Sequence, residues 1–331
     1  MNTDSLAAHI PIIQREIAQW LASHRYSEAS VEAICAGIAY LPQNTLCIAI
    51  GGTTSFILTD EGAVISLPTP TLGSVADLGI FIIQNIPSGI TQVLLSFAFA
   101  LDTAGQLDGV LMHGGKGHTL SDMVAKPVGA SISHWLHTHF NLDITVSVLN
   151  DQSVQALAYH QMSQTHAFFS GVVGTGLNLC VVRNAQLIGL EPVAIRVSHP
   201  FEVSQAVSLE ELVSGYSLHH LYNALVDPAS AVSNTSRLSQ VVLNQGKNAS
   251  VAADVIAFSA DVFATLVVSV AEHFAVHTNL VCMEGSVFWH LPGYAARVRG
   301  RISQNFGQAV TIDRALTQIE ALQLLLRHAS N

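Results

Sequence analysis

Residues 46–58 read LCIAIGGTTSFIL, and residues 167–182 read AFFSGVVGTGLNLCVV. Each stretch opens with an apolar run of the length and composition typical of a buried strand. The run stops at glycines, Gly51-Gly52 in the first stretch and Gly174-Thr175-Gly176 in the second, and another apolar run follows. A strand, a glycine turn and a hairpin therefore occur twice in the chain. This pattern predicts an α/β protein with two related halves that face a cleft.

The rest of the chain alternates between helical and strand-like segments. In the N-terminal segment, Ile13, Ile17 and Trp20 recur at helical spacing and predict an amphipathic helix. Helices are expected at about 11–24, 28–39, 75–86, 120–140, 151–163 and 313–328 and through most of 208–274, and strands at 46–50, 55–59, 63–67, 92–99, 144–149, 167–173, 177–182 and 279–283.

The composition excludes several classes of protein. Of the 331 residues, 50% are hydrophobic and 11% are charged, whereas a disordered chain needs low hydrophobicity and high net charge. The formal net charge is −10, and binding to a phosphate backbone needs basic surface, so nucleic acid is not an expected partner. The most apolar long stretch, 255–274, contains Asp261 and Glu272, which favours a buried helix over a membrane span.

Cys35, Cys47, Cys180 and Cys282 are far apart and form no CxxC pair. Zinc and dithiol sites therefore have little support, and reduced, buried thiols are expected. The N-terminus has neither the basic region nor the apolar region of a secretory signal. Both features lead us to expect a cytoplasmic protein.

The two glycine turns are candidate phosphate-binding loops. A strand that stops at glycine lets the backbone approach a ligand closely and turns N–H groups toward phosphate oxygens. Neither Gly51-Gly52-Thr53 nor Gly174-Thr175-Gly176 matches the Walker A loop or the GxGxxG motif. Each turn alone is also explained as a plain hairpin turn. Their occurrence as a pair, one in each half, favours the phosphate-binding role.

Asn150-Asp151 ends an apolar strand and opens a helix. Ligands bind at the carboxyl ends of strands in α/β sheets, so a carboxylate here can act as general base toward a hydroxyl. Asp151 can equally be a helix N-cap, and the two roles are compatible. Lys116 lies between glycines in GGKGH, where a solvated loop lysine is the alternative, and Glu210 follows Ser208, where helix capping is the alternative.

Three histidines, His134, His137 and His139, lie close together in HWLHTH. The first two share a helix face, so a metal is conceivable. No acidic third ligand is evident nearby, and a metal site is therefore not expected there.

Taken together and in order, seven segments resemble the hexokinase family of eukaryotic type, in its glucokinase-like branch. LCIAIGGTTSFIL is similar to the family's phosphate-1 segment LALDLGGTNFRVL, and SVLNDQSVQALA resembles ALVNDTVGTLMA. One such segment is weak evidence, whereas seven in the family's order are specific. The other five are LLSFAFA (94–100), GGKGH (114–118), SGVVGTGLNLCVV (170–182), LEELVSGYSL (209–218) and VCMEGSVFWHLPGY (281–294).

The resemblance implies the actin-like ATPase (ribonuclease H-like) fold, in which two α/β domains close over a hexose and ATP with Mg²⁺. Asp151 matches the family's catalytic base, which takes the proton from the 6-hydroxyl of the sugar. The family's second sugar glutamate lies in an NTEWG motif that is absent here, and Glu191 is the only candidate. The remaining matches are Lys116, Asn150, Asn178 and Glu210 to sugar ligands, Gly51, Gly52, Thr53, Gly174, Thr175 and Gly176 to phosphate contacts, and Gly285 and Ser286 to nucleotide-side contacts.

The sequence departs from the family pattern on the phosphate and nucleotide side. Ala49 stands where the family has the aspartate that organises Mg²⁺, and Phe56 replaces the arginine of that segment. Ala98 and Gly115 replace a serine and a threonine of the sugar pocket. The family's C-terminal SGKGAA run, which helps to hold the nucleotide, has no counterpart. The catalytic base is thus retained while the metal anchor is lost.

The sequence therefore predicts a kinase that transfers the γ-phosphoryl group of ATP to the 6-hydroxyl of a hexose. The alternative is a non-catalytic protein of hexokinase fold that binds sugar or regulates a partner, and a smaller donor such as polyphosphate is a third possibility. The expected small domain is 45–149, joined by the C-terminal helix 313–328, and the large domain comprises 1–44 and 150–312.

Overall fold

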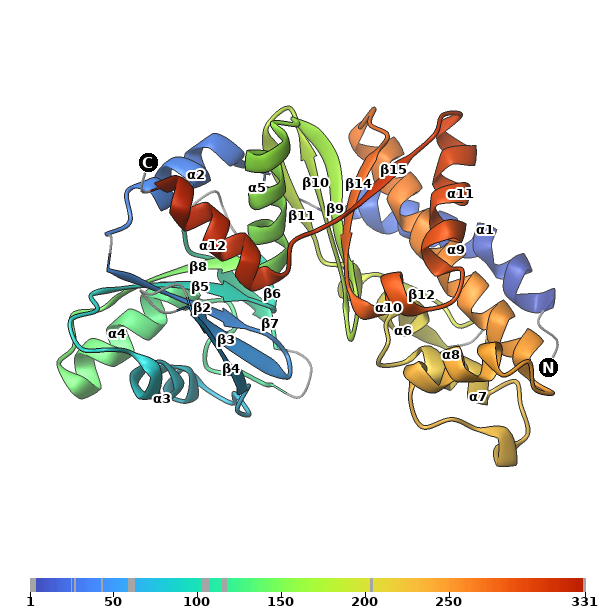
Figure 1. Cartoon of the computed structure of the whole chain (residues 1–331), viewed down its shortest axis with the longest axis horizontal. Helices are drawn as coiled ribbons and strands as arrows, with labels where there is room; N and C mark the ends of the chain where they lie inside the picture. The colour runs from blue at the N-terminus through green and yellow to red at the C-terminus, as the bar shows by residue number, and fades with distance from the viewer. Residues whose placement is uncertain are drawn as a thin grey trace. The chain divides into compact units, whose positions relative to one another are not determined.

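The computed structural model (Figure 1) describes residues 4–24, 26, 28–42, 44–58, 63–102, 107–114, 118–202 and 205–329. The chain forms two compact units. Unit 1 comprises Met1–Arg25, Ala167–Val181 and Leu190–Ala315, and unit 2 comprises Tyr26–His166, Val182–Gly189 and Leu316–Asn331. The segment 45–149 and the C-terminal helix both fall in unit 2, and the domain boundaries predicted from the sequence remain a proposal.

Unit 2 is built on a five-stranded sheet of order β4-β3-β2-β5-β8. β2, β5 and β8 are parallel neighbours, and β3 and β4 complete the sheet as an antiparallel meander. All six residues of β2 and of β5 are buried, as expected for central strands covered on both faces. The strands are β2 (Thr45–Ile50), β3 (Thr54–Leu58), β4 (Val64–Pro68), β5 (Gln92–Phe97) and β8 (Thr145–Asn150).

Helices cover both faces of this sheet (Figure 1). α3 (Val75–Asn85) and α4 (Val128–Phe140) lie on one face, and α5 (Asp151–Ser163) and α12 (Gln318–Ala329) lie on the other, with α2 (Val31–Ala39) beside α12. The buried side chains of α3 and α4 form one apolar core with those of β2, β5 and β8. A small antiparallel pair, β6 (Ala100–Asp102) and β7 (Val110–His113), follows β5.

Unit 1 contains most of a six-stranded sheet of order β1-β11-β10-β9-β14-β15. β9, β14 and β15 are parallel neighbours. The strands are β1 (Glu28–Ser30), β9 (Ala167–Val173), β10 (Leu177–Arg183), β11 (Gln186–Leu190), β14 (Leu280–Glu284) and β15 (Thr311–Arg314), and a separate antiparallel pair consists of β12 (Arg196–Ser198) and β13 (Ala206–Ser208).

The long helix α9 (Ala249–Phe274) forms the helical core of unit 1, and α1 (Asp4–Ser23), α6 (Leu209–Val213), α7 (Leu218–Asn223), α8 (Thr235–Leu243) and α11 (Tyr294–Phe306) pack against it. Two 3₁₀ turns, Pro192–Ala194 and Pro228–Ser230, and the short helix α10 (Ser286–His290) complete the unit. Among the described residues, α9 is the one helix long and apolar enough to span a membrane, and 72% of its most apolar window is buried inside the protein. This burial agrees with the core helix that the sequence predicts.

Four predicted helices begin elsewhere in the structure. The helix expected at 11–24 begins at Asp4, and the helix expected at 28–39 begins at Val31, because residues 28–30 form β1 and pair with β11. The helix expected at 120–140 begins only at Val128, because the segment before it runs along β7 through bridges to Val124 and Pro127. The helix expected at 313–328 is preceded by strand β15, which pairs with β14, and begins at Gln318. The helix that begins at Asp151 and ends at Ser163 has the predicted bounds.

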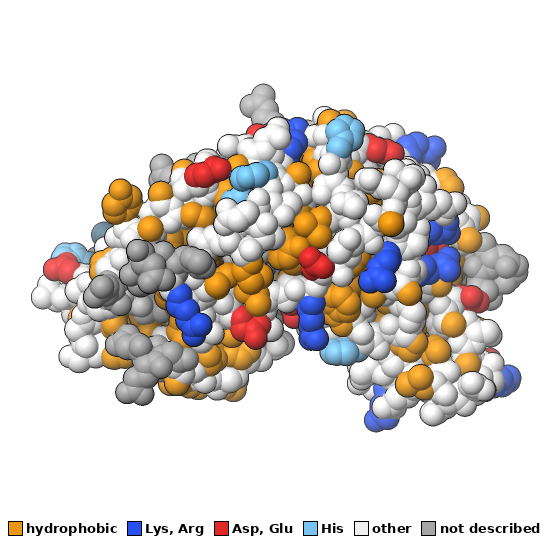
Figure 2. Space-filling view, turned by 45° about the horizontal axis from the view of Figure 1, so that its top comes forward, with side chains coloured by type: hydrophobic (Ala, Val, Ile, Leu, Met, Phe, Trp, Pro, Cys, Tyr) orange, Lys and Arg blue, Asp and Glu red, His pale blue; other side chains and the backbone are white. Residues whose placement is uncertain are grey.

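The four cysteines are free thiols, as expected. Cys47, Cys180 and Cys282 are buried and Cys35 is partly buried. Burial raises the pKa of the Cys47 thiol to about 12, so this group stays protonated at neutral pH. The face in Figure 2 shows charged side chains scattered among apolar and uncharged ones, in keeping with the low content of charged residues.

Candidate functional site

The parallel strands of unit 2 end side by side. Ile50, Phe97 and Asn150 are register partners across β2, β5 and β8. The first glycine turn follows Ile50, and Asp151 follows Asn150, so both lie at the same carboxyl edge of this sheet. This is the edge at which α/β sheets bind ligands.

The turn Gly51-Gly52-Thr53 is fixed by its own hydrogen bonds and by those of neighbouring segments. The Gly51 N–H donates to the Thr54 carbonyl at 3.1 Å. A Cβ on Gly51 would lie 2.6 Å from that carbonyl oxygen, so the position requires glycine. The Gly52 carbonyl is 2.9 Å from Nε2 of His118. The turn is therefore preorganised for a close approach of its backbone to a ligand.

Asn150 is the N-cap of α5, and Asp151 is the first residue of that helix, so the prediction of Asp151 as N-cap is wrong. The Asn150 side chain accepts a hydrogen bond from the Gln152 N–H at 2.9 Å and donates to the Phe99 carbonyl at 3.1 Å. Oδ1 of Asp151 also accepts from the Gln152 N–H, at 2.8 Å. Asn150 thus anchors the strand-to-helix corner that holds the partly exposed Asp151 carboxylate in place.

The position that carries the metal-organising aspartate in the resembling family is closed here. Ala49 is completely buried, and its register partner on β5 is Ser96. The Ser96 hydroxyl accepts a hydrogen bond from Nε2 of Gln318, on α12, at 2.6 Å. Side chains of register partners lie on the same face of a sheet, so α12 covers Ala49, and a carboxylate at this position would be buried beneath a helix.

In unit 1 the second glycine turn meets the segment that follows β14. β9 and β14 are parallel, so Gly174 and Gly285 follow neighbouring strand ends. The Gly174 N–H donates to the Gly176 carbonyl at 3.0 Å, and the Gly174 carbonyl accepts from the Gly215 N–H at 2.7 Å. A Cβ on Gly174 would lie 3.8 Å from the Ser286 nitrogen. The predicted phosphate loop and the predicted nucleotide-side residues are thus neighbours.

Gly285 is the tightest point of this arrangement, because its φ is +112° and an added Cβ would lie 2.3 Å from the Val173 carbonyl oxygen. We expect Gly285→Ala to lower the free energy of unfolding by about 2 kcal/mol through backbone strain. The matched control is Gly189→Ala, where the added Cβ has no neighbour within 4 Å. Equal melting temperatures for the two variants would contradict the expected strain.

Glu210 and Asn178 flank the same turn. Oε2 of Glu210 accepts a hydrogen bond from the Leu177 N–H at 2.9 Å, and Oδ1 of Asn178 accepts from the Leu179 N–H at 2.8 Å. The predicted capping by Ser208 is present, but its capping-box partner is Glu211. Glu210 therefore remains available to hold the start of β10. Glu191 lies next to the 3₁₀ turn that packs against α6, the helix that carries Glu210.

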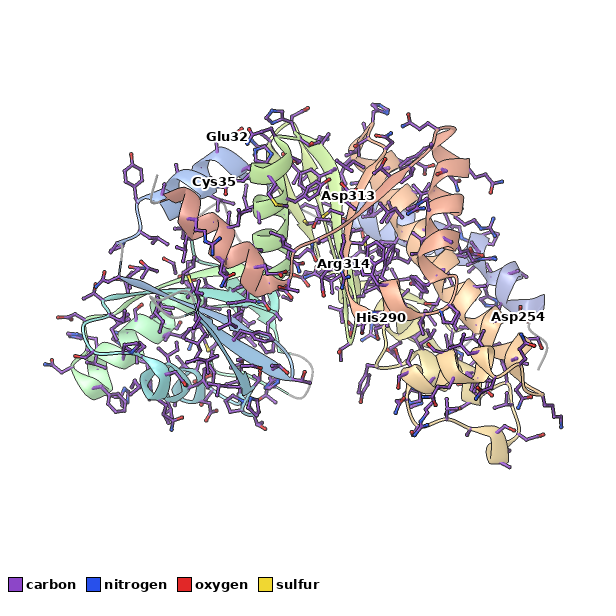
Figure 3. The ribbon with its side chains drawn as sticks, in the orientation of Figure 1. Glu32, Cys35, Asp254, His290, Asp313 and Arg314 are labelled. Atoms are coloured by element: carbon purple, nitrogen blue, oxygen red, sulfur yellow. The ribbon has the colours of Figure 1, made fainter. Side chains whose placement is uncertain are left out.

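A cavity of about 620 Å³ opens beside the second glycine turn, within the size range of small-molecule sites. Its walls come from α7, α8, α10 and the segments before them, and Figure 3 labels His290 at the end of α10. No Lys, Arg, Asp or Glu is among the described residues that line it. The lining consists of Gly174, Thr175, Gly215, Tyr216, His219, His220, Ser233, Asn234, Thr235, Ser236, Ser239, Ser286, Val287, His290 and Leu291.

Sequence reasoning missed most of this lining. Tyr216 lies within a recognised segment, whereas His219, Thr235 and Ser239 match no motif. The adjacent pair His219-His220 and the polar run 233–236 are the only local signals. Both are common on protein surfaces, so only the tertiary structure shows that they share a cavity.

Other candidate positions divide into those outside the described residues and those with another role. Lys116 and Gly115 lie outside the described residues. His137 bonds to Asp143 at 2.9 Å and His139 to the Trp135 carbonyl at 3.0 Å. Across the described part of the chain, no group of three or more His, Cys, Asp or Glu side chains could hold a metal ion.

Comparison with solved structures places this geometry in a known fold. The chain is similar to the hexokinase from Schistosoma mansoni complexed with glucose, with a TM-score of 0.64, 13% identity and 100% of both chains covered. It is also similar to the ROK hexokinase from Thermus thermophilus, with a TM-score of 0.58, 18% identity and coverage of 86% of this chain and 96% of the other. A ROK-family transcriptional regulator, a homologue of the E. coli MLC protein, matches with a TM-score of 0.64 and 12% identity, over 86% of this chain and 78% of its own.

No protein-family model and no curated protein matches the sequence. The fold is the actin-like ATPase fold of hexokinases and ROK-family sugar kinases, as the sequence predicts.

Proposed function

We propose that this protein is a hexokinase of the glucokinase-like branch, which transfers the γ-phosphoryl group of ATP to the 6-hydroxyl of a hexose. The observation that carries the proposal is the cavity beside Gly174-Thr175-Gly176. Its volume of about 620 Å³ suits a nucleoside, and its wall supplies hydroxyl, imidazole and phenol groups. Polyphosphate would need cationic side chains to bind it, and it would not need a pocket of this kind. The solved relatives support the same interpretation, since one is a ROK glucokinase from Streptomyces griseus in complex with glucose and AMPPNP.

In unit 2, the roles follow from the corner between β8 and α5. Asp151 accepts the proton of the sugar hydroxyl at a carboxylate oxygen as that hydroxyl attacks. Asn150 positions Asp151 through the cap of α5, and the resemblance also makes Asn150 a sugar ligand. The Gly51 N–H closes the turn by donating to the Thr54 carbonyl, and the backbone N–H groups of Gly52 and Thr53 lie at the same edge, where they can face phosphate oxygens. A positioned base and preorganised donors are what phosphoryl transfer requires of the protein.

In unit 1, Thr175 and Ser286 line the cavity and hold the nucleotide, with Gly174 and Gly176 at its phosphates. Glu210, Asn178 and Glu191 are the proposed sugar ligands of this unit, and the resemblance adds Lys116 of unit 2. A bound Mg²⁺ would supply neutralisation of the phosphate charge, and the structure describes no group of side chains that would hold it without the phosphates. Mg²⁺ needs only one or two protein carboxylates when phosphates complete its shell, so the loss of a carboxylate at Ala49 weakens this site without excluding it.

The proposal is tested by a coupled kinase assay on the purified chain with glucose, mannose, fructose and N-acetylglucosamine, each with Mg-ATP. We expect turnover with at least one hexose, and we expect ATP to be a better donor than polyphosphate. Turnover with polyphosphate and none with ATP would leave the cavity without its proposed occupant. Binding of a sugar without its phosphorylation by Mg-ATP would contradict the proposed kinase activity toward that sugar.

Nucleotide affinity is expected to depend on pH through His219, which lines the cavity. The His219 and His220 rings are 4.0 Å apart. Burial, and then the charge of His220, lower the pKa of His219 below its usual 6.5. Protonation of His219 adds positive charge to the wall of the proposed nucleotide cavity, so affinity for ATP should rise as the pH falls from 7.5 to 5.5, by no more than about fivefold because the pKa of His219 is lowered.

The measurement is a titration of ATP at both pH values, with a double variant, His219→Gln and His220→Gln, as the control. The variant corrects for protonation of ATP itself. A pH dependence that is identical in both proteins would exclude a role for these histidines.

A second candidate function is a sugar-binding regulator without catalysis. The buried Ala49 favours it, because the metal-organising carboxylate is missing. The similarity to a ROK-family transcriptional regulator is consistent with it. The kinase assay distinguishes the two functions.

A further inference from the structure

Two residues from other segments of unit 2 hold the carbonyl groups of the first glycine turn. The turn joins β2 to β3, whereas Thr69 follows β4 and His118 follows β7. The Thr69 hydroxyl donates to the Gly51 carbonyl at 2.9 Å, and the Thr69 N–H donates to the Thr53 carbonyl at 3.0 Å. Nε2 of His118 lies 2.9 Å from the Gly52 carbonyl oxygen. All three carbonyl groups of Gly51-Gly52-Thr53 are therefore bonded.

The partners of His118 determine which of its ring nitrogens carries the proton. Nδ1 is 3.0 Å from the Leu72 backbone nitrogen, and a backbone N–H can only donate, so Nδ1 is the acceptor. Nε2 therefore carries the proton and donates to the Gly52 carbonyl. His118 is only 8% exposed, and its ring lies at 89° to that of Phe99, with centroids 5.5 Å apart. The imidazole is thus buried and bonded at both nitrogens.

The Thr69 hydroxyl is oriented by a second buried group. Its single proton goes to the Gly51 carbonyl, so the Ser55 hydroxyl, 2.8 Å away, donates to Thr69. Ser55 lies in β3 and is completely buried. Thr69 is therefore fixed relative to the sheet.

These bonds also fix the directions of two N–H groups. A trans peptide group is planar, and its C=O and N–H point in opposite directions. The Gly52 N–H shares a peptide group with the Gly51 carbonyl, and the Thr53 N–H shares one with the Gly52 carbonyl. Thr69 and His118 therefore turn these two N–H groups away from themselves, and Thr53 is exposed to solvent.

The Phe99 ring that contacts His118 belongs to the segment that anchors the proposed base. The Phe99 carbonyl accepts from Nδ2 of Asn150 at 3.1 Å, and Asn150 caps the helix that begins at Asp151. The donors proposed for the phosphate and the base proposed for the hydroxyl therefore rest on one buried set of contacts.

We propose that His118 and Thr69 are positioning residues for phosphoryl transfer, which aim the N–H groups of Thr53 and Gly52 at the terminal phosphate of the nucleotide. The inference rests on the proposed kinase function, and it adds two residues that touch neither sugar nor nucleotide. Each acts through one peptide group of the turn. Donors that are held in place before the ligand arrives stabilise phosphate charge without reorganisation.

His118 offers a matched pair of variants, because asparagine and glutamine each reproduce one of its two hydrogen bonds. In His118→Asn the amide takes the position of Nδ1, where its oxygen can accept from the Leu72 N–H, and the side chain is too short to reach Gly52. In His118→Gln the amide reaches the position of Nε2 and can donate to the Gly52 carbonyl. Binding of the terminal phosphate should follow the bond to Gly52.

The test is isothermal titration of the full chain with AMPPNP and with AMP in the same Mg²⁺ buffer. AMPPNP carries a terminal phosphate, whereas AMP has only the first. We expect His118→Asn and Thr69→Val to weaken AMPPNP binding about tenfold, the effect of losing one hydrogen bond to a charged group, and to leave AMP binding unchanged. His118→Gln and Thr69→Ser keep the donors and should bind AMPPNP within about threefold of the unmodified protein.

The control is His139→Asn, an exposed histidine of α4, which should bind both ligands like the unmodified protein. A variant that is merely unfolded loses AMP binding and has an altered melting curve. The inference is overturned if AMPPNP affinity is unchanged in His118→Asn and Thr69→Val, if AMP affinity falls equally, or if His118→Gln binds as weakly as His118→Asn. Failure of the unmodified protein to bind AMPPNP would overturn the inference and the proposed function together. AMPPNP binding without turnover of Mg-ATP would contradict the kinase activity alone.

Discussion

Replacing Asp151 with asparagine is expected to lower the turnover number for hexose phosphorylation by about 10²–10⁴-fold, the usual contribution of a positioned general base. Asparagine has the same shape and can still accept the hydrogen bond that Oδ1 of Asp151 receives from the Gln152 N–H at 2.8 Å. It is too weakly basic to take the proton of the attacking hydroxyl. The coupled kinase assay should therefore show a fall in kcat with little change in the KM for sugar.

The control for this prediction is Asp143→Asn in the same unit. The Asp143 side chain is 92% exposed and bonds only to His137 among the described residues, so this variant should keep full activity. Melting curves show whether Asp151→Asn remains folded, since a first-turn carboxylate contributes only about 0.3–1 kcal/mol to a helix. A folded Asp151→Asn variant with unchanged kcat would mean that another group is the base.

Local sequence determined the parts of the site that lie on strand ends. The buried runs of β2, β8 and β9 end at Gly51, Asn150 and Gly174, and these are positions at which the proposed site residues lie. Apolar periodicity and turn residues act over a few positions, so these elements can be predicted from one sequence. The resemblance to hexokinases added the order of the segments, and the comparison with solved structures confirms the fold.

Elements that depend on distant partners could not be predicted. Asp313 and Arg314 are predicted as the start of a helix, and they belong to strand β15 because β14 offers a parallel edge. The segment 120–127 follows β7 for the same reason. The wall of the cavity proposed for the nucleotide combines α7, α8 and α10, and no local pattern shows that polar residues on three separate helices face one space.

Ala49 is a position where sequence and structure together say more than either alone. The sequence shows that the family's aspartate is absent. The structure adds that Ser96 and Gln318 occupy the neighbouring space with a hydrogen bond of 2.6 Å. Restoring the carboxylate by Ala49→Asp would bury a charge without a partner, which is costly, so a simple reversal is not expected to rebuild the metal site.

Asp261→Asn is expected to lower the free energy of unfolding by about 2 kcal/mol at neutral pH, because it removes the charge-assisted hydrogen bonds between a buried carboxylate and two half-exposed arginines. The Asp261 side chain is 5% exposed, and both oxygens accept hydrogen bonds, at 2.7 Å from Arg297 and at 3.0 Å from Arg301. These bonds join α9 to α11 in the core of unit 1. Urea unfolding of both proteins at pH 7 measures the difference.

The interactions of Asp261 with Arg297 and Arg301 also determine how the free energy of unfolding changes in acid. Burial alone would raise the pKa of Asp261, but hydrogen bonds and charge from Arg297 and Arg301 outweigh it and hold the pKa below its usual value. A lowered folded-state pKa stabilises the protein above the unfolded pKa of about 3.9 and loses that effect as pH falls through the folded value. The difference in free energy of unfolding between the native protein and Asp261→Asn should therefore become smaller below about pH 4.

The matched control is Asp254→Asn, on the same helix but exposed to solvent (Figure 3). It should change the stability by less than about 0.5 kcal/mol, as usual for surface substitutions, at every pH. Other carboxylates with lowered pKa values, such as Asp77, titrate in both proteins, so they cancel in the comparison. A gap for Asp261→Asn that is absent at neutral pH, or one that widens in acid, would show that the two arginines do not stabilise the fold through this carboxylate. If the difference in unfolding free energy is present at neutral pH and disappears only in acid, the ionised Asp261 carboxylate is what stabilises the packing of α11 against α9. Asp261 is then the one buried charge of this apolar helix.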